Sequence, residues 1–293
     1  MGKKNGSPTR KEEIAMEMKS KKLPKIIFTM LMIIIGLGSV FPFIFMILST
    51  FKIESEVLQA SFKLWPSQWI LDNIQALFVS DYYDFMQWYR NTIIMTGTSL
   101  LLKFFFVSYT AYGFSKIQFK GRDVIFMVLL AALMIPSDIM ILPRYIIFKR
   151  IGILNTMWSI ILPSLVDVYF VFLLRQAFIS IPESLSEAAR IDGCGHFQIY
   201  FKIIMPLAKP AVATMMLFSF VWIWNDYMSP YLYISDVKKQ MLSVGIQLFA
   251  TGQVLNYGVL MAGATLVLLP VILIFIFAQN YFVEGVATSG VKG

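Results

Sequence analysis

The sequence predicts an all-α integral membrane protein with six transmembrane helices and both termini in the cytosol. Of its 293 residues, 58% are hydrophobic and only 14% are charged, whereas soluble domains carry about a quarter charged residues. Several segments reach the roughly 20 mostly apolar residues that a helix needs to cross a bilayer. A single large soluble core is disfavoured, because it could not hide so much apolar surface from water.

The first 25 residues form a polar, basic tail, which we expect to lie in the cytosol, and the membrane domain follows over residues 26–293. The first span is longer than the apolar region of a signal peptide and lacks its small-residue cleavage site. Tryptophans and tyrosines in residues 52–89 favour the membrane–water interface and indicate an external loop. The six spans are expected at residues 26–51, 91–114, 124–143, 157–178, 207–228 and 255–281.

Positive charge sets the orientation of these spans. With both termini inside, the cytosolic segments hold sixteen lysines and arginines, and the external loops hold eight. Cytosolic loops of membrane proteins carry such an excess. The net charge of +8 is therefore explained by the orientation of the chain in the membrane. No nucleic-acid partner is expected, because the basic residues are not interleaved with aromatic residues as in RNA-binding proteins. The same orientation places residues 180–206, between the fourth and fifth spans, in the cytosol.

Residues 180–206 are polar in an otherwise apolar chain and predict two short helices. Pro182 suits the first turn of a helix, and Gly193 is expected to end it. A second helix is expected over about His196 to Ile204. Small side chains on the first helix leave a surface that another protein can approach closely, and we expect both alanines of this face to point outward. The residues expected to share the face are Leu185, Ala188 and Ala189.

This segment resembles the EAA loop of the permease subunits of bacterial ABC importers. Three residues separate the E-A-A triplet from a glycine, and nine more precede the I-x-L-P end of the family pattern, where Met205 replaces the usual leucine. "WND" at residues 224–226 and "IPSDIMILPRY" at residues 135–145 resemble the carbohydrate branch, of the maltose-transporter type. The core of the resemblance covers about residues 88–282. The matching positions are Glu187, Ala188, Ala189, Gly193, Ile203 and Pro206.

The resemblance implies a binding-protein-dependent permease subunit that carries a carbohydrate, such as an oligosaccharide, into the cytoplasm. It also implies a second homologous permease, a homodimer of two ATPase subunits, an extracellular or periplasmic solute-binding protein, and a multi-pass location in the bacterial cytoplasmic (inner) membrane. The EAA loop would be a coupling helix that docks into the ATPase, with His196 near the rim. The alternative is a helix that packs only on its own membrane domain. The docking residues implied are Glu187, Ala188, Ala189, Arg190, Asp192 and Gly193.

No catalysis is expected in this chain. It lacks the G-x-x-x-x-G-K-[ST] phosphate loop, so ATP and Mg²⁺ would be used by the partner ATPase, with no cofactor bound here. One cysteine and one histidine allow no internal disulfide and make a protein metal site unexpected. No credible Ser-His-Asp set is present, because the histidine lies far from most candidate nucleophiles.

Two ionisable residues fall inside predicted spans, Lys103 in the second and Asp167 in the fourth. Such groups are costly in a bilayer and usually face partners or a water-filled path. Two interpretations stay open: a structural pair, or simple snorkelling of the lysine, against a lining of the sugar pathway. Asn225 and Asp226, at the outer end of the fifth span, are candidates for an outer gate or a contact with the binding protein. They are equally compatible with interfacial caps.

A secondary transporter driven by an ion gradient is the main alternative function, with Lys103 and Asp167 as its ion-coupling residues. A membrane scaffold that transports nothing is a third possibility. The amphipathic break at residues 180–206 favours the importer, because a secondary transporter has no ATPase to dock.

Overall fold

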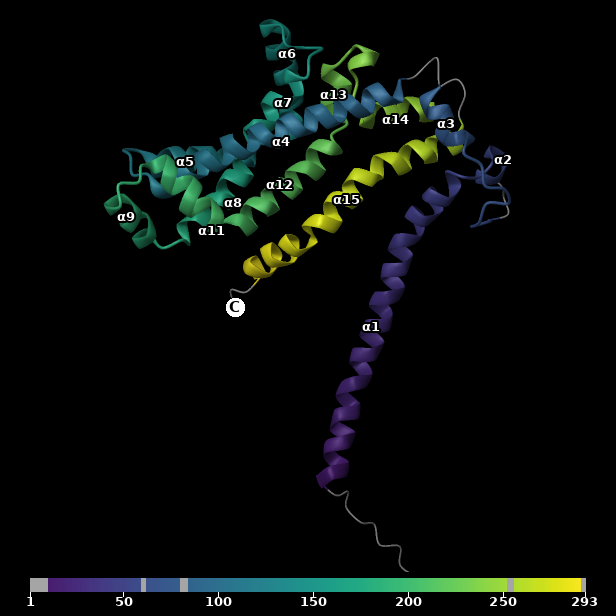
Figure 1. Ribbon diagram of the computed structural model, residues 1–293, viewed down its shortest axis with the longest axis horizontal. Coiled ribbons are helices and arrows are strands. Elements are labelled where there is room, and N and C mark those ends of the chain that lie inside the picture. Colours follow the sequence, from purple (N-terminus) through teal and green to yellow (C-terminus); the bar gives the residue numbers. More distant parts are fainter. Residues whose placement is uncertain (1–9, 59–61, 80–83, 252–255, 291–293) are drawn as a thin grey trace, which may run out of the picture.

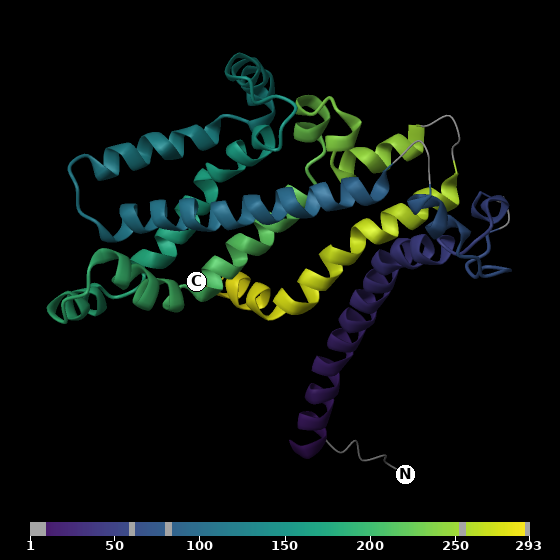
Figure 2. The ribbon, with the colours of Figure 1, turned by 45° about the horizontal axis from the view of Figure 1, so that its top comes forward.

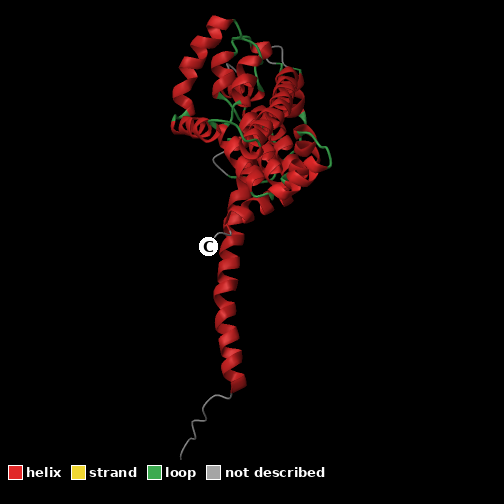
Figure 3. Cartoon of the chain, turned by 90° about the vertical axis from the view of Figure 1, so that its left-hand side faces the viewer, coloured by secondary structure: helices red, strands yellow, loops and turns green. Residues whose placement is uncertain are grey.

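The computed structural model describes residues 10–58, 62–79, 84–251 and 256–290. Within these ranges every regular element is helical and no strand occurs. Helix α1 (Arg10–Ser49) projects from a body formed by the other helices (Figure 1, Figure 3). Because α1 begins at Arg10, most of the basic tail expected at residues 1–25 continues helically into the first apolar segment; the first nine residues lie outside the described ranges.

Four helical segments are long and apolar enough to cross a membrane, and two further pairs of helices qualify as bent spans, which gives up to six. The prediction of an all-helical membrane protein is therefore confirmed. The four are Ile27–Ser49, Phe85–Lys116, Trp158–Ile179 and Tyr257–Gln279. The bent pairs are Arg122–Met134 with Ser137–Ile151, at 92°, and His196–Leu207 with Lys209–Trp224, at 82°.

The span expected at residues 124–143 falls on one of the two bent pairs. Helix α5 (Arg122–Ala131) and the 3-10 turn η1 (Ala132–Met134) end before Pro136, and the chain resumes in η2 (Ser137–Met140) and α6 (Ile141–Ile151). Ile135 is extended, with φ −88° and ψ 115°, because a following proline disfavours helical backbone. The bend turns α6 away from the rest of the body (Figure 2).

The span expected at residues 157–178 is interrupted near its middle. Helix α7 (Trp158–Leu165) contains Pro163 and ends at Val166, whose ψ is 87°. Helix α8 (Val168–Ile179) then begins after Asp167, whose carboxylate accepts a hydrogen bond from the Phe170 amide at 3.4 Å. The break therefore places an ionisable N-cap residue inside a predicted membrane span.

Helix α4 (Phe85–Lys116) forms the centre of the body and packs against α7, α8, α12 (Lys209–Trp224) and α14 (Leu242–Thr251). Helix α15 (Tyr257–Gly290) packs against α12, α1 and α3 (Asp72–Phe78) (Figure 2). The remaining short elements are α2 (Glu54–Val57), α13 (Met228–Tyr233) and η4 (Val237–Lys239).

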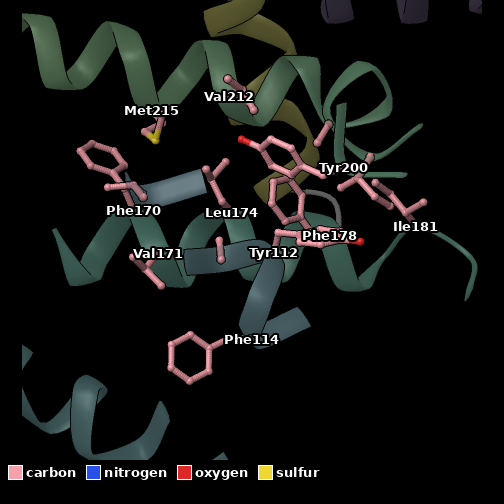
Figure 4. Packing of buried hydrophobic residues seen from close by; sticks show 14 of the residues in the cluster. Tyr112, Phe114, Phe170, Val171, Leu174, Phe178, Ile181, Tyr200, Val212 and Met215 are labelled. Atoms are coloured by element: carbon pink, nitrogen blue, oxygen red, sulfur yellow. The ribbon is translucent and has the colours of Figure 1, made fainter. Parts of the chain in front are cut away.

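A buried aromatic and aliphatic core joins the C-terminal end of α4 to α8, α12 and the segment that resembles a coupling loop (Figure 4). Its largest members have almost no contact with solvent, so this segment is packed firmly onto the membrane body. The labelled side chains that are at most 1% exposed are Tyr112, Phe170, Leu174, Phe178, Tyr200 and Met215.

Candidate functional site

Residues 183–207 form a helical hairpin at one end of the body (Figure 1). Helix α9 (Glu183–Ile191) is followed by α10 (His196–Ile199), as the glycine pattern predicts. The second helix does not continue regularly to Ile204, because Tyr200–Ile204 form a π-helical turn, η3, before α11 (Met205–Leu207). Single π-helical turns are frequent at functional sites, and this one lies just before the 82° bend into α12.

Gly193 ends α9 in a left-handed conformation, with φ +82°. The amide of Cys194 donates to the Ala189 carbonyl at 2.8 Å, and the amide of Gly193 donates to the Arg190 carbonyl at 3.0 Å. These two bonds make a Schellman motif, which satisfies the last carbonyls of the helix. Gly193 therefore sets the direction in which the chain leaves α9.

Replacing Gly193 by alanine is expected to destabilise this helix end by about 1–2 kcal/mol, because an L-residue is strained at positive φ. Gly195→Ala is the matched control. An added Cβ meets open space at both glycines, but the φ of Gly195 is −73°. Thermal unfolding of the purified protein should show a lower midpoint for Gly193→Ala alone. Equal effects of the two replacements would contradict this account.

The outer face of α9 differs from the one that the sequence predicts. Ala189 is only 7% exposed and packs in the core, so the expectation that both alanines point outward is wrong for this residue. Ser186 is also buried, whereas Ala188 is exposed. Leu185 and Ile191 are 43% and 87% exposed, and together with Ala188 they form an apolar stripe at a spacing of three residues. The prediction missed Ile191, although this spacing in the sequence is a signal for it.

The charged residues of α9 divide between the outer face and contacts within the chain. Glu187 and Asp192 are exposed, as docking would require. Arg190 is exposed too, but it donates to Glu183 Oε1 at 3.2 Å, and Glu183 Oε2 accepts a bond of 3.1 Å from Lys116. Lys116 also donates to the Ile181 carbonyl at 2.7 Å, and its side chain is 3% exposed. This lysine, which no sequence motif indicated, fixes the base of α9 to the end of α4.

A second set of contacts joins α10 and η3 to α4. The hydroxyl oxygens of Tyr200 and Ser108 share a hydrogen bond of 2.5 Å, and His196 Nδ1 lies 3.4 Å from the Tyr112 hydroxyl. Cys194 is partly buried against the same core. Cys194 is thus a packing residue, whereas His196 is exposed and contacts Tyr112 at the edge of the core. These contacts attach the hairpin to α4.

A separate polar site lies at the break between α7 and α8. Lys103 Nζ is 2.7 Å from Asp167 Oδ2, with side chains 3% and 20% exposed, and it lies 4.8 Å from the centre of the Phe170 ring. The two ionisable residues inside predicted spans are therefore paired. They border a pocket of about 260 Å³, here called the broken-helix pocket. Its lining residues are Lys103, Ile160, Ser164, Asp167, Trp222, Ile223 and Asp226.

Asn225 and Asp226, the two candidates for an outer gate or binding-protein contact, have different surroundings in the structure. Asn225 follows the last residue of α12, and its side-chain amide donates to the Val221 carbonyl at 2.8 Å. Asp226 Oδ1 accepts from the Ser229 amide at 3.1 Å, while the same carboxylate borders the broken-helix pocket. Asn225 is thus a helix-end residue, and only Asp226 joins the pair. Among the described residues no group of three or more potential metal ligands occurs.

Comparison with known proteins adds a consistent set of similarities. The family described as binding-protein-dependent transport system inner membrane component matches residues 105–288. The arabinooligosaccharides transport system permease protein AraQ of Halalkalibacterium halodurans is 31% identical, over 95% of this chain and all of its own. The polygalacturonan/rhamnogalacturonan transport system permease protein YtcP of Bacillus subtilis is 32% identical, over 94% of this chain and all of its own.

One solved structure resembles the whole fold. It is a bacterial ABC transporter involved in the import of the acidic polysaccharide alginate, which superposes with a TM-score of 0.79 at 24% identity. The match covers 95% of this chain and all of the other. The bent and broken helices described above therefore occur within an arrangement already observed in a transporter.

Proposed function

The chain belongs to the binding-protein-dependent transport system inner membrane component family, the permeases of ABC importers, and we propose that it carries an oligosaccharide into the cytoplasm. Subunits of this family are not catalytic, and ATP is hydrolysed by a separate subunit. The substrate class is supported by relatives named for arabinooligosaccharides, polygalacturonan and lactose.

The observation that carries the proposal is the exposed face of α9. Leu185, Ala188 and Ile191 present an apolar stripe beside the exposed carboxylates of Glu187 and Asp192. An apolar centre with a polar rim is the usual composition of a protein interface. We assign this face to the ATPase subunit, which would use ATP and Mg²⁺, and we assign Gly193 the role of setting its orientation.

The proposed arrangement has six spans, with the two bent pairs counted as one span each and both termini in the cytosol. The excess of lysines and arginines on that side supports it. A multi-pass permease of this kind would lie in the bacterial cytoplasmic membrane. It would work with a second homologous permease, two ATPase subunits and an extracellular or periplasmic solute-binding protein.

Coupling would be mechanical. Closure of the ATPase dimer on ATP would displace α9, and the buried Lys116 contacts would transmit that displacement to α4. The Tyr200–Ser108 bond gives a second attachment to the same helix. Rocking of helical bundles against one another then alternates access to the two sides of the membrane.

Purification of the tagged chain from cells that express the whole transporter tests this function. We expect an ATPase subunit to copurify, and we expect uptake of oligosaccharide to stop when the phosphate-loop lysine of that ATPase is replaced. Uptake should survive an ionophore that dissipates ion gradients while ATP is held constant. Uptake that stops with the ionophore but not with the ATPase replacement would favour a secondary transporter. Absence of any ATPase partner would contradict the proposal.

A further inference from the structure

A basic pocket lies at the N-terminal end of α4. It has a volume of about 410 Å³ and forms where the first turns of α4 meet η4 and the residues that precede α7. Three of the eight lysines and arginines expected outside the cytosol line it, and no carboxylate occurs among its lining residues in the described part of the chain. External segments of membrane proteins carry few such cations, so their concentration here favours an anionic ligand. The lining residues of this outer basic pocket are Gln87, Arg90, Asn91, Ile94, Asn155, Thr156, Met157, Lys238 and Lys239.

Buried hydrogen bonds hold the outer basic pocket in shape. Asn91 is 4% exposed, and its side-chain amide donates to the Lys238 carbonyl at 2.9 Å. The indole N–H of Trp88, a fully buried residue, donates to the Val237 carbonyl at 2.7 Å. These bonds fix η4 against the turn of α4 that carries Arg90.

The cations of the pocket are available to a ligand. Within the described ranges, the Arg90 guanidinium and the Lys238 ammonium have no hydrogen bond or ion pair, and both residues are exposed. Lys239 Nζ donates to the Asn155 carbonyl at 3.3 Å and lies 4.0 Å from Asp236 Oδ2. A guanidinium and two ammonium groups that line one pocket suit a phosphate group, because its oxygens can accept from all three.

Toward the middle of the membrane, the exposed face of α4 becomes apolar. Ile94 and Leu101 are 44% and 59% exposed, and a Cβ added to Gly97 would meet open space. A small anion would gain nothing from such a face, whereas an acyl chain could lie along it. Positions three and four residues apart share one side of a helix, and those of this α4 stripe are Arg90, Ile94, Gly97 and Leu101.

The α4 stripe is as long as one membrane leaflet is deep. Arg90 and Leu101 are eleven positions apart, or about 16 Å along a helix, and half of the hydrocarbon core is about 15 Å thick. Leu101 lies at the middle of the candidate span Phe85–Lys116. At the other end, Trp158 follows Met157 and is 50% exposed, and tryptophans are enriched at the membrane–water interface. The cations therefore lie at the depth of lipid headgroups.

We propose that the outer basic pocket and the α4 stripe together bind one anionic phospholipid of the outer leaflet, of which phosphatidylglycerol is the simplest example. The Arg90 guanidinium and the two lysines of η4 bind the phosphate, and one acyl chain lies along the stripe across Gly97. The inference rests on the orientation proposed above, which puts this end of α4 at the outer surface. Because α4 and η4 hold the phosphate together, the lipid attaches the outer loop to the central helix.

Lipid binding by the complete transporter tests the proposal. The delipidated complex of both permeases and the ATPase would be titrated in detergent with phosphatidylglycerol or phosphatidylcholine, and native mass spectrometry would give the dissociation constants. We expect at least one site that prefers phosphatidylglycerol by at least about tenfold, since each nearby base favours an anionic headgroup. Filling it should also raise the midpoint of thermal unfolding.

A paired substitution locates the headgroup. Arg90→Gln combined with Lys238→Gln is expected to weaken binding of phosphatidylglycerol by at least about tenfold and to leave phosphatidylcholine unaffected. Lys149→Gln combined with Arg150→Gln is the matched control, because it removes the same charge at two exposed positions of α6 outside the pocket. This control should change neither constant.

A further substitution locates the acyl chain. Gly97→Phe fills the gap in the α4 stripe without a change of charge, and it is expected to weaken binding of phosphatidylglycerol by about threefold or more, because the ring occupies the path of the chain. Gly113→Phe is the control, at a glycine of the same helix outside the stripe where an added Cβ also meets open space. It should leave the constant unchanged.

Two soluble competitors distinguish a lipid from other anions. Glycerol 3-phosphate carries the phosphate without acyl chains, and trigalacturonate is an acidic sugar; neither should displace phosphatidylglycerol at a hundredfold excess. Displacement by the first would indicate a site for free phosphates, and displacement by the second a site for acidic substrates, and either result would overturn the proposal. Equal binding of the two lipids, or unchanged constants in the Arg90–Lys238 or the Gly97 variant, would also overturn it. Binding in detergent requires no transport, so such results would leave the proposed function standing.

Discussion

Replacing Lys103 by methionine is expected to lower the free energy of unfolding by about 3–5 kcal/mol, because it leaves the Asp167 carboxylate without its partner inside the protein. The pair is close, at 2.7 Å, and its side chains are only 3% and 20% exposed, so water cannot replace the lost contact fully. Asp167→Asn should also destabilise the protein, since it leaves the ammonium group unpaired, although asparagine can still cap α8. Thermal unfolding of the purified transporter measures both effects.

The double variant Lys103→Met with Asp167→Asn is expected to recover most of this loss, because neither charge remains buried alone. Such a recovery identifies the pair as a structural link between α4 and α8. Lys120→Met, at an exposed position, is the control and should change stability by less than about 0.5 kcal/mol. A double variant no more stable than either single one would show that the two charges act separately.

Ile191→Glu and Glu187→Lys are each expected to reduce ATP-driven uptake by about a hundredfold while the protein stays folded. The Ile191 side chain is 87% exposed, so a charge there is tolerated in the free chain but must lose its water in an interface. Glu187→Lys reverses the charge of a side chain at the polar rim of the same face of α9. The amount of ATPase that copurifies, together with uptake, measures the effect.

Lys120→Glu supplies the control for this second prediction, because it reverses a charge at an exposed position outside α9. It should leave copurification and uptake near the level of the unchanged protein. Unfolding midpoints should be similar for all three variants, since each position is exposed. Full copurification and uptake with both α9 variants would rule out this face as the ATPase contact.

The site was predictable from the sequence as far as local rules reach. The glycine after a short helix predicted the turn at Gly193. The position of Lys103 and Asp167 inside apolar spans predicted that they need a partner or water, because an ionisable side chain is energetically unfavourable in a bilayer. The spacing of Leu185, Ala188 and Ile191 indicates that they share a face of α9, but it does not decide whether that face or the adjacent one with Ala189 points outward, because neighbouring positions on a helix differ by only about 100°. Burial of Ala189 depends on how Lys116 and the core rotate this helix.

The class of protein was determined by the sequence alone, since the length and apolarity of the spans are properties of the chain itself. The spacing of the E-A-A triplet, Gly193 and Pro206 likewise depends on no distant contact. Only the tertiary structure decided where the spans bend at Pro136 and break at Asp167. Only the tertiary structure showed that Lys103 pairs with Asp167, 64 positions away, and that Asp226 lines the same pocket. Contacts between residues so far apart in the sequence depend on helix packing and not on local spacing.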